Sequence, residues 1–431
     1  MTNDEAKLPT GFGRLWTAQT VSSLGDGVTN AALPLLALAL TRDPMALAVV
    51  SAAGTLPWLL FGVLGGALVD RWDRRRTMWV ADAARAVLLA IPAVAAVLGV
   101  LSIPLLAAVA FLLGLGGLFF DTAATAYLPH LLGRDTVLLE RANARLRAAQ
   151  TAGSGFVGPP AGSALLALGR AVPLLADAVS FALSALLVRS LPAAPRPVPE
   201  ARESLLRQAR AGASYVFGDR LLLGLALRPA VGNVAFLAVE TVLALFAHDR
   251  LGIHTFGFGL LLTAEAAGGL LGAGIASFLG RRLGTGTALT CTAAVEGLAV
   301  LGLAAAPNPY VAGLALAVCG AGMGATMVLA PSLRQAIVPA HLMGRVASTS
   351  RMLAMCAAPF GAFLGGWLAS AFDIRTPLYA AGGLLLAMTA VTATMTSNRR
   401  VEAALRSAAP PAGPDHPESA VSVQHGVLES S

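Results

Sequence analysis

The sequence contains Gly66-Ala67-Leu68-Val69-Asp70-Arg71-Trp72-Asp73-Arg74-Arg75-Arg76, a run of charge between two long apolar segments, 46–69 and 77–100. Each segment is long enough to cross a bilayer, which takes about 20 apolar residues in a helix. Two spans joined by so few residues form a helical hairpin. Short basic loops stay on the cytoplasmic side of a membrane. The stretch therefore predicts both the topology of this hairpin and its orientation.

The composition excludes a large soluble enzyme. The chain of 431 residues is 56% hydrophobic and only 12% charged, with a mean hydropathy of +0.72, whereas soluble domains carry about 25% charged residues. The net charge of +7 would suggest a nucleic-acid partner in a soluble protein. Here the positive charge falls in short segments between apolar spans, so we expect a lipid bilayer and no nucleic acid as the partner.

The apolar segments predict an all-α membrane protein with twelve transmembrane helices. The least regular of these spans are the fifth, which begins with charged residues, and the seventh, which contains Arg228-Pro229. The predicted spans are 13–40, 46–69, 77–100, 103–127, 142–168, 172–191, 220–247, 256–280, 285–306, 309–333, 346–370 and 376–397.

The distribution of arginine predicts the orientation of the chain. If both termini are cytoplasmic, most of the thirty Lys and Arg residues lie in cytoplasmic segments. The external loops then hold only Arg42, Arg170, Arg250 and Arg375. This asymmetry follows the rule that positive loops remain inside. The sequence therefore predicts a multi-pass protein of the cell membrane with both termini in the cytoplasm.

The longest break between spans, 192–219, divides the chain into two six-helix bundles, 1–191 and 220–397. The break begins with a proline-rich extended linker, and 201–217 could form an amphipathic helix at the cytoplasmic surface. The polar segment 398–431 is predicted to be a disordered cytoplasmic tail. Arg345 and Arg351 repeat the spacing of Arg141 and Arg147, as expected of two pseudo-symmetric halves. Transporters built from such repeats bind substrate between the halves at mid-bilayer.

The charged hairpin loop resembles the loop motif of the major facilitator superfamily, Gly-x-x-x-Asp-Arg/Lys-x-Gly-Arg-Arg/Lys, and the resemblance covers residues 10–398. The matching residues are Gly66, Asp70, Arg71, Arg74 and Arg75, and Asp73 replaces the usual second glycine. The resemblance implies a secondary transporter that works by alternating access, as a monomer and without a cofactor. It also implies that Arg74 bridges Asp70 and Asp121 when the transporter faces outward; the alternative is that these acids only neutralise the loop.

A second motif lies on the fifth span. Gly158, Pro159 and Gly162 match part of the pattern Gly-x-x-x-Gly-Pro-x-x-Gly-Gly that marks exporters of this superfamily, while Ser154 and Ser163 replace two of its glycines. The partial match favours export. Simple helix packing is the alternative, because small residues let membrane helices approach closely.

Shorter stretches narrow the resemblance to one branch. That branch holds enterobactin-type siderophore exporters, macrolide efflux proteins and Tap-like multidrug pumps, and it does not fix the substrate. The stretches that resemble it are Arg14-Leu15-Trp16, Ser22-Ser23-Leu24-Gly25-Asp26-Gly27, Leu128-Pro129-His130-Leu131 and Asp177-Ala178-Val179-Ser180-Phe181.

Ionisable residues inside the spans are the candidates for proton coupling or substrate contact, because a charge in the bilayer is costly and usually functional. Asp26 lies about 18 Å into the first span and either carries the coupling proton or caps a helix irregularity between Gly25 and Gly27. Glu240 and Glu265 could each bind a proton or a cationic compound. The others are expected to be structural: Glu296, Asp177, and the pair Asp82–Arg85, which is one helical turn apart.

The sequence thus predicts a proton-coupled exporter of small amphiphilic compounds such as an antibiotic, a drug or a secondary metabolite. A siderophore or lysophospholipid transporter, and a non-transporting receptor or scaffold, are the alternatives. No enzyme is expected, because the chain has no metal-ligand spacing of histidines and no phosphate-binding glycine loop. Cys291, Cys319 and Cys356 lie in predicted spans and are interpreted as packing residues.

Overall fold

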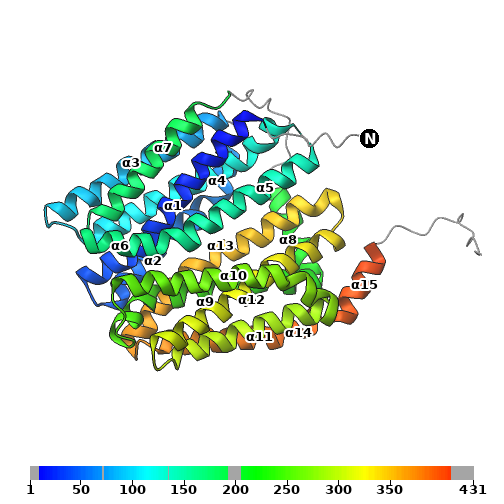
Figure 1. Cartoon of the computed structure of the whole chain (residues 1–431). Helices are drawn as coiled ribbons and strands as arrows, with labels where there is room; N and C mark the ends of the chain where they lie inside the picture. Colours follow the sequence, from blue (N-terminus) through cyan, green and yellow to red (C-terminus); the bar gives the residue numbers. More distant parts are fainter. Residues whose placement is uncertain (1–8, 70–71, 134, 193–204, 409–431) are drawn as a thin grey trace, which may run out of the picture.

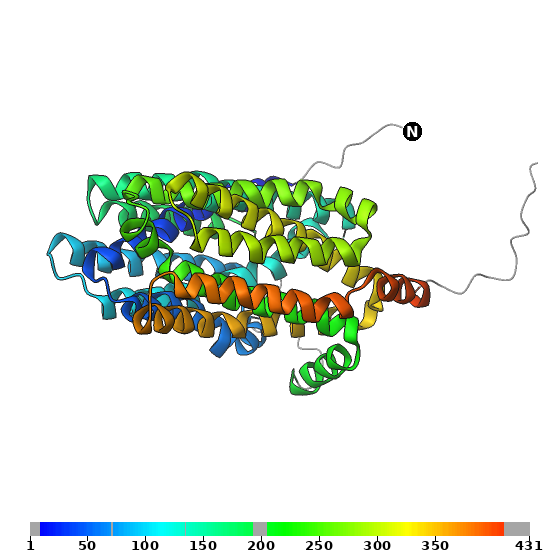
Figure 2. The same ribbon diagram turned by 90° about the horizontal axis from the view of Figure 1, so that it is seen from below.

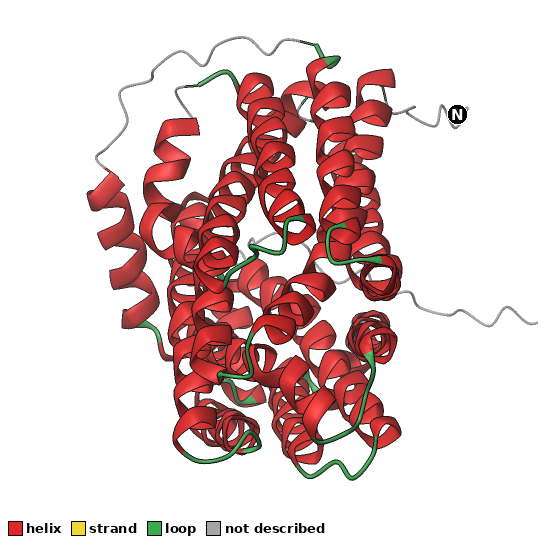
Figure 3. Ribbon diagram, turned by 90° about the vertical axis from the view of Figure 1, so that its left-hand side faces the viewer, coloured by secondary structure: helices red, strands yellow, loops and turns green. Residues whose placement is uncertain are grey.

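The computed structural model describes residues 9–69, 72–133, 135–192 and 205–408, and all regular structure in these residues is helical (Figure 3). Eleven of these helices are each long and apolar enough to cross a membrane. A twelfth crossing is made of three consecutive helical pieces, which confirms the predicted twelve spans. Most boundaries fall within a few residues of the predicted ones.

The spans form two groups in the order of the chain, one above the other in Figure 1. The N-terminal half contains α1 (Thr10–Leu40), α2 (Pro44–Val69), α3 (Arg74–Val97), α4 (Ile103–Leu132), the composite span of α5 (Thr136–Gln150), η1 (Thr151–Val157) and α6 (Gly158–Leu168), and α7 (Val172–Arg189). The C-terminal half contains α9 (Arg220–Asp249), α10 (Thr255–Leu283), α11 (Thr285–Ala304), α12 (Pro309–Ile337), α13 (Ala340–Ala371) and α14 (Thr376–Met395).

The composite span owes its π-helical segment η1 to two prolines. Pro159 and Pro160 have no N–H, so they cannot donate to the carbonyl groups of Gly155 and Phe156 one turn earlier. The backbone widens there, and the N–H of Gly158 donates to the carbonyl of Gly153, five residues back. Such π-helical turns are rare in proteins, and those that occur often lie at functional sites.

Each half has its own apolar interior and an apolar exterior. Phe12, Met78 and Tyr127 are buried in the N-terminal half, and Val242 and Phe246 are buried in the C-terminal half. Large apolar side chains also cover the outer faces, for example on α3, α7, α10 and α11. A soluble protein rarely exposes so much contiguous apolar surface, so these faces are the ones that contact lipid.

The two halves meet along α2 and α13 and along α6 and α10. Gly366 of α13 lies directly against Ala48 and the backbone of Pro44, where no side chain would fit. Arg42, in the loop before α2, forms an ion pair of 3.3 Å with Asp249 at the end of α9. The contact of Gly366 and this ion pair lie at the end of the bundle away from the charged turn before α3, and we call this end the opposite end.

The basic end of the molecule is the end that carries the turn before α3 and two shorter helices, α8 (Leu205–Gly218) and α15 (Asn398–Ala408) (Figures 1 and 2). Helix α8 confirms the predicted amphipathic helix and packs against α13. Helix α15 is a correction, because 398–408 was predicted to be disordered. It forms because Val401 is buried against the C-terminal core, while Arg399 and Arg406 are exposed. The remaining predicted tail, 409–431, and the linker segment 193–204 lie outside the described residues.

Candidate functional site

The loop motif is built around capping interactions at the basic end. Gly66 lies in the last turns of α2, and Asp70 and Arg71 lie outside the described residues. Asp73 caps α3, its carboxylate accepting a hydrogen bond of 2.8 Å from the N–H of Arg76. This explains how an acid can stand where related loops have glycine, because Asp is a preferred N-cap residue.

The two arginines of the motif donate to helix carbonyl groups. Arg75 Nη2 lies 2.6 Å from the carbonyl oxygen of Arg189, at the end of α7. Arg74 Nη1 lies 3.1 Å from the carbonyl oxygen of Ala126 on α4, five residues beyond Asp121. In this conformation Arg74 therefore contacts the backbone near Asp121 and not its carboxylate, and the bridge expected for the outward-facing state stays a prediction.

The residues of the exporter-type motif lie where three helices approach closely. A side chain at Gly158 would lie 2.5 Å from the Cα of Gly27 on α1, and one at Gly162 would lie 2.8 Å from the Cα of Val28. The carbonyl of Pro159 lies against Gly259 of α10, in the other half. The motif thus joins α6 to both α1 and α10, which accounts for its small residues; its role in export stays a prediction.

A cavity of about 250 Å³ opens among the helices of the N-terminal half, and we call it the N-half cavity. Asp26, Asp121 and Asp177 line it together with Arg85, and Trp58 and Phe181 supply aromatic surface. These residues come from α1, α2, α3, α4 and α7. The structure therefore brings Asp26 and Asp121, two of the predicted site residues, to a single cavity.

Arg85 is held in this cavity by a buried set of partners. Its Nη1 atom lies 3.5 Å from a carboxylate oxygen of Asp82, whose other oxygen accepts a hydrogen bond of 2.6 Å from Ser184. The guanidinium also lies 4.9 Å from the ring centre of Phe181, a distance typical of a cation–π contact. The expected Asp82–Arg85 ion pair is thus confirmed, but Arg85 also reaches the cavity.

Gly116 and Gly117 of α4 make room for that arginine. A side chain at Gly116 would lie 2.9 Å from Arg85 Cγ, and one at Gly117 would meet Arg85 Nη2. The small residues of α4 are therefore part of the site, because a larger side chain at either position would displace the guanidinium.

Asp177 joins α7 to α1 beside Asp26. Its carboxylate accepts hydrogen bonds from Thr29 at 2.5 Å and from Ser180 at 2.9 Å. Gly25 lies directly against Asp177 and Ser180 and leaves no space for a side chain. The glycine before Asp26 thus serves helix packing, and α1 stays a continuous α-helix through Asp26, so the helix irregularity that Asp26 might have capped is absent.

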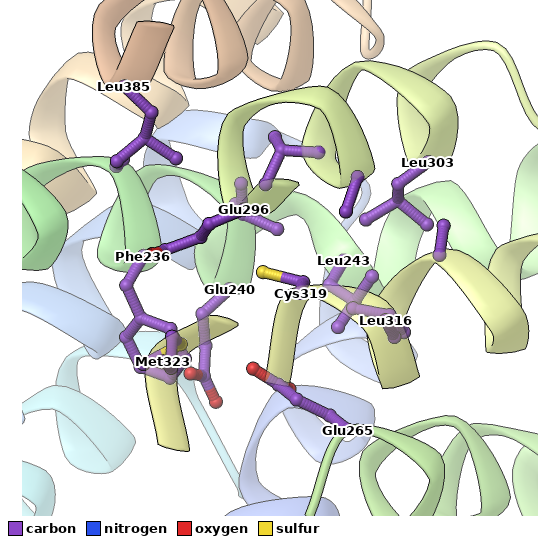
Figure 4. A pocket seen from close by; sticks show the side chains of 15 residues that line it. Phe236, Glu240, Leu243, Glu265, Glu296, Leu303, Leu316, Cys319, Met323 and Leu385 are labelled. Carbon is purple, nitrogen blue, oxygen red and sulfur yellow. The ribbon is translucent and has the colours of Figure 1, made fainter. Parts of the chain in front are cut away.

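The C-terminal half has a different acidic site, which we call the C-half pocket. Glu240 of α9, Glu265 of α10 and Glu296 of α11 line a largely apolar space of about 20 Å³. Figure 4 shows the carboxylates of Glu240 and Glu265 close to each other, with Cys319 and Met323 nearby. The structure thus gathers Glu240 and Glu265, as a functional pair requires, and adds Glu296, which was expected to be structural.

One ring contact joins the two halves beside the N-half cavity. The guanidinium of Arg351 on α13 lies 5.0 Å from the ring centre of Trp58 on α2. Trp58 lines the cavity, so a residue of the C-terminal half contacts part of the wall of this cavity.

Sequence reasoning missed Arg85, Asp177 and Trp58 as cavity residues. The i, i+3 spacing of Asp82 and Arg85 predicted the ion pair, but it did not predict that the pair lies on the face of α3 that borders the cavity. The signal that could have found the charged ones was the presence of ionisable residues in the first, third, fourth and sixth spans, because such residues inside a membrane face the interior of a bundle and usually pair with one another.

The described residues contain no group of three or more His, Cys, Asp or Glu side chains placed to hold a metal ion. The three glutamates of the C-half pocket therefore do not form a metal centre. All three cysteines are free, with Cys319 buried, Cys356 half-buried and Cys291 exposed. Burial of Cys319 agrees with the interpretation of the cysteines as packing residues, whereas the exposure of Cys291 does not.

Comparison with known proteins gives the family. The model of a family described as transmembrane secretion effector matches residues 8–427. The chain belongs to this family of major facilitator transporters. It is therefore a multi-pass membrane transporter that moves small molecules and not an enzyme, as the sequence predicted.

The relatives of this chain support the predicted branch. The chain is 30% identical to the multidrug efflux pump Tap of Mycolicibacterium fortuitum over 84% of this chain and 90% of that protein. It is 29% identical to the multidrug efflux pump Tap of Mycobacterium tuberculosis over 84% of this chain and 88% of the relative.

Solved structures confirm the fold. A bacterial homologue of the iron transporter ferroportin in an inward-facing state superposes with a TM-score of 0.72 at 18% identity, covering 91% of this chain and all of that one. A bacterial homologue of the lysosomal transporter Spinster gives a TM-score of 0.71 at 15% identity, covering 93% and 98%. These likenesses confirm the major facilitator fold with its two bundles.

Proposed function

We propose that this transporter exports small amphiphilic compounds, such as antibiotics or secondary metabolites, in exchange for protons. The observation that carries the proposal is that the buried acids gather in two sites of very different size. The relationship to pumps named for multidrug efflux supports the direction and the substrate class.

The C-half pocket suits the proton. A space of about 20 Å³ holds about one water molecule, so no drug-sized compound fits between Glu240 and Glu265 in this conformation. Two carboxylates close together do not both ionise without cost, because like charges repel. The pair is therefore suited to hold and release a proton while the surrounding apolar walls exclude larger ligands.

The N-half cavity suits the substrate. Its volume of about 250 Å³ approaches the lower end of the range for small-molecule sites, about 300 Å³. Trp58 and Phe181 offer apolar surface, and Asp26 and Asp121 offer negative charge. Such walls suit an amphiphile that carries a basic group. Asp26, through its place at the centre of α1, could also exchange a proton with the C-half pair.

Alternating access follows from the division into two bundles. The bundles 1–191 and 220–397 would rock about the contacts of α2 with α13 and of α6 with α10, and Gly158, Pro159 and Gly162 would keep α6 packed closely against α1 and α10. The basic end would face the cytoplasm, by the positive-inside rule. There Arg74, bound to Asp70 and Asp121, would hold the outward-facing state of a monomeric transporter.

The driving force is sufficient for such exchange. A membrane potential of 100 mV is worth about 2.3 kcal/mol for each charge moved. A pH difference of one unit adds about 1.4 kcal/mol for each proton, which corresponds to about tenfold accumulation of the substrate.

The test is uptake into inverted membrane vesicles that contain the full chain. A panel of cationic and neutral amphiphilic antibiotics, a ferric-siderophore ligand and a lysophospholipid would be assayed with a pH gradient and after an ionophore has collapsed it. We expect gradient-dependent uptake of amphiphilic antibiotics that Glu265→Gln abolishes. The matched control is Glu402→Gln, which changes an exposed glutamate on α15 and leaves uptake unchanged.

Other outcomes would favour the other functions. Uptake restricted to the siderophore ligand or the lysophospholipid would overturn the substrate class but keep the transport mechanism. The absence of any gradient-dependent flux, together with unchanged drug tolerance in cells that express Asp26→Asn, would favour a receptor or scaffold.

A further inference from the structure

Arg228 is a buried cation without a direct partner. It lies on α9 immediately before Pro229, and only 7% of its surface is exposed. Its Nε, Nη1 and Nη2 atoms are all buried, and none has a hydrogen-bond partner among the described residues. A buried charge without a partner is strongly unfavourable, so Arg228 requires a compensating charge within the interior of the C-terminal half.

The neighbouring helices offer hydroxyl groups that are already engaged. Thr389 and Thr392 of α14 and its C-cap residue Thr396 are buried in this half, and each donates its hydroxyl hydrogen to a carbonyl group of that helix. Asn233 of α9 donates to the carbonyl of Ala354 on α13. These groups do not neutralise a guanidinium, because none of them carries charge.

Glu296 is the acid that lies at a similar depth to Arg228 in the C-terminal half. Both α9 and α11 start at the basic end, and Arg228 lies eight residues into α9 while Glu296 lies eleven residues into α11. At 1.5 Å per residue these positions are about 12 Å and about 16 Å from that end, less than one helical turn apart in depth.

The helical register places Arg228 on the face of α9 that lines the C-half pocket. Ala235 and Val239 follow Arg228 by seven and eleven residues, which puts all three on the same face of the helix. Both residues line the pocket together with Glu296. Glu296 therefore lies between the buried arginine on one side and the pair Glu240 and Glu265 on the other.

We infer that Arg228 is the fixed counter-charge of Glu296 and so leaves Glu240 and Glu265 as the groups that bind and release the proton. Arg228 is a positioning residue in this scheme, because it acts through Glu296 and does not touch the substrate. The expected effect of Arg228 on transport rests on the proposed proton coupling. The pairing of Arg228 with Glu296 does not, because it concerns only the stability of the folded chain.

The test is a double-substitution cycle on the full-length protein. Arg228→Gln and Glu296→Gln each leave one buried charge uncompensated, while the double variant removes both. We expect each single variant to lower the melting temperature in detergent and to reduce gradient-driven uptake at least tenfold. The double variant should recover most of both losses. Arg220→Gln, an exposed arginine on the same helix, is the matched control and should behave as the wild type.

A pH profile separates this role from simple packing. Without Arg228, the charge of Glu296 acts uncompensated on Glu240 and Glu265, so the pH of half-maximal uptake in Arg228→Gln should move to higher pH and return in the double variant. Losses that add in the double variant, or a single variant that matches the wild type in melting temperature, would overturn the pair. The melting temperatures test it even if the wild type shows no proton-driven uptake, which would instead contradict the proposed function.

Discussion

The two halves share one fold but treat buried charge differently. In the N-terminal half, Arg85 is paired with Asp82 and lies among aromatic rings beside a cavity of about 250 Å³. In the C-terminal half, Arg228 has no direct partner among the described residues, and three glutamates share a space of about 20 Å³. The first arrangement can admit a ligand, whereas the second is closed to everything larger than water or a proton.

This difference teaches how a repeated fold can divide two tasks. Two matched bundles provide similar helix packing, and the side chains placed inside them decide what each bundle can hold. A charge that is paired and fixed shapes a stable cavity wall. Carboxylates with few fixed partners keep the freedom to change protonation, which coupling to a proton gradient requires.

The largest expected effect comes from breaking the fixed pair of the N-terminal half. Arg85→Met should destabilise the protein by about 3 kcal/mol or more, because it leaves Asp82 buried without its counter-charge. Thermal unfolding in detergent and the yield of monodisperse protein would measure this. Arg145→Met, at an exposed arginine of α5, is the control. A melting temperature equal to that of the wild type would show that the pair does not stabilise this half.

A smaller loss of stability is expected from Gly25→Ala. The added carbon would lie 2.8 Å from Ser180 Cβ and would press on the Asp177 carboxylate, and overpacking of this kind costs about 1–3 kcal/mol. Gly62→Ala is the matched control, because nothing lies within 4 Å of the carbon that it adds. If both variants melt at the same temperature, the close approach of α1 and α7 is more tolerant than the structure indicates.

The division of tasks itself is tested by comparing Glu265→Gln with Asp26→Asn. Loss of the proton site should reduce accumulation about tenfold for each unit of pH gradient, since that is what one coupled proton supplies. Asp26→Asn should instead raise the substrate concentration for half-maximal uptake while gradient dependence remains. Uptake in inverted vesicles at two pH gradients would measure both. The reverse result would assign the proton to Asp26 and the substrate to the C-terminal half.

The smallest effect is expected where the halves are joined by exposed charges. Arg42 and Asp249 are 3.3 Å apart, and Arg42 is 67% exposed, so water screens most of their attraction. Arg42→Gln should change the free energy of unfolding by less than about 1 kcal/mol and leave transport unchanged. A marked change in the transport rate would show that this ion pair helps to hold the opposite end closed.

Much of the fold could be predicted because lipid imposes simple rules. Apolar length gave the twelve spans, including the seventh, since Pro229 is tolerated inside α9. The positive charge in the short loops predicts that both termini are cytoplasmic, and this orientation stays a prediction. The tail at 398–408 was mispredicted because its helix depends on burying Val401 against the core, a contact that local polarity does not reveal.

The sequence alone determined that this chain is a membrane protein with twelve spans, because the length of the apolar segments is set by the bilayer and is readable residue by residue. Only the tertiary structure decided which buried charges meet. It placed Asp26 with Arg85, Asp121 and Asp177, and Glu240 with Glu265 and Glu296. The reason is that each of these groups comes from a different helix, and their meeting depends on how helices far apart in the sequence rotate and pack against one another.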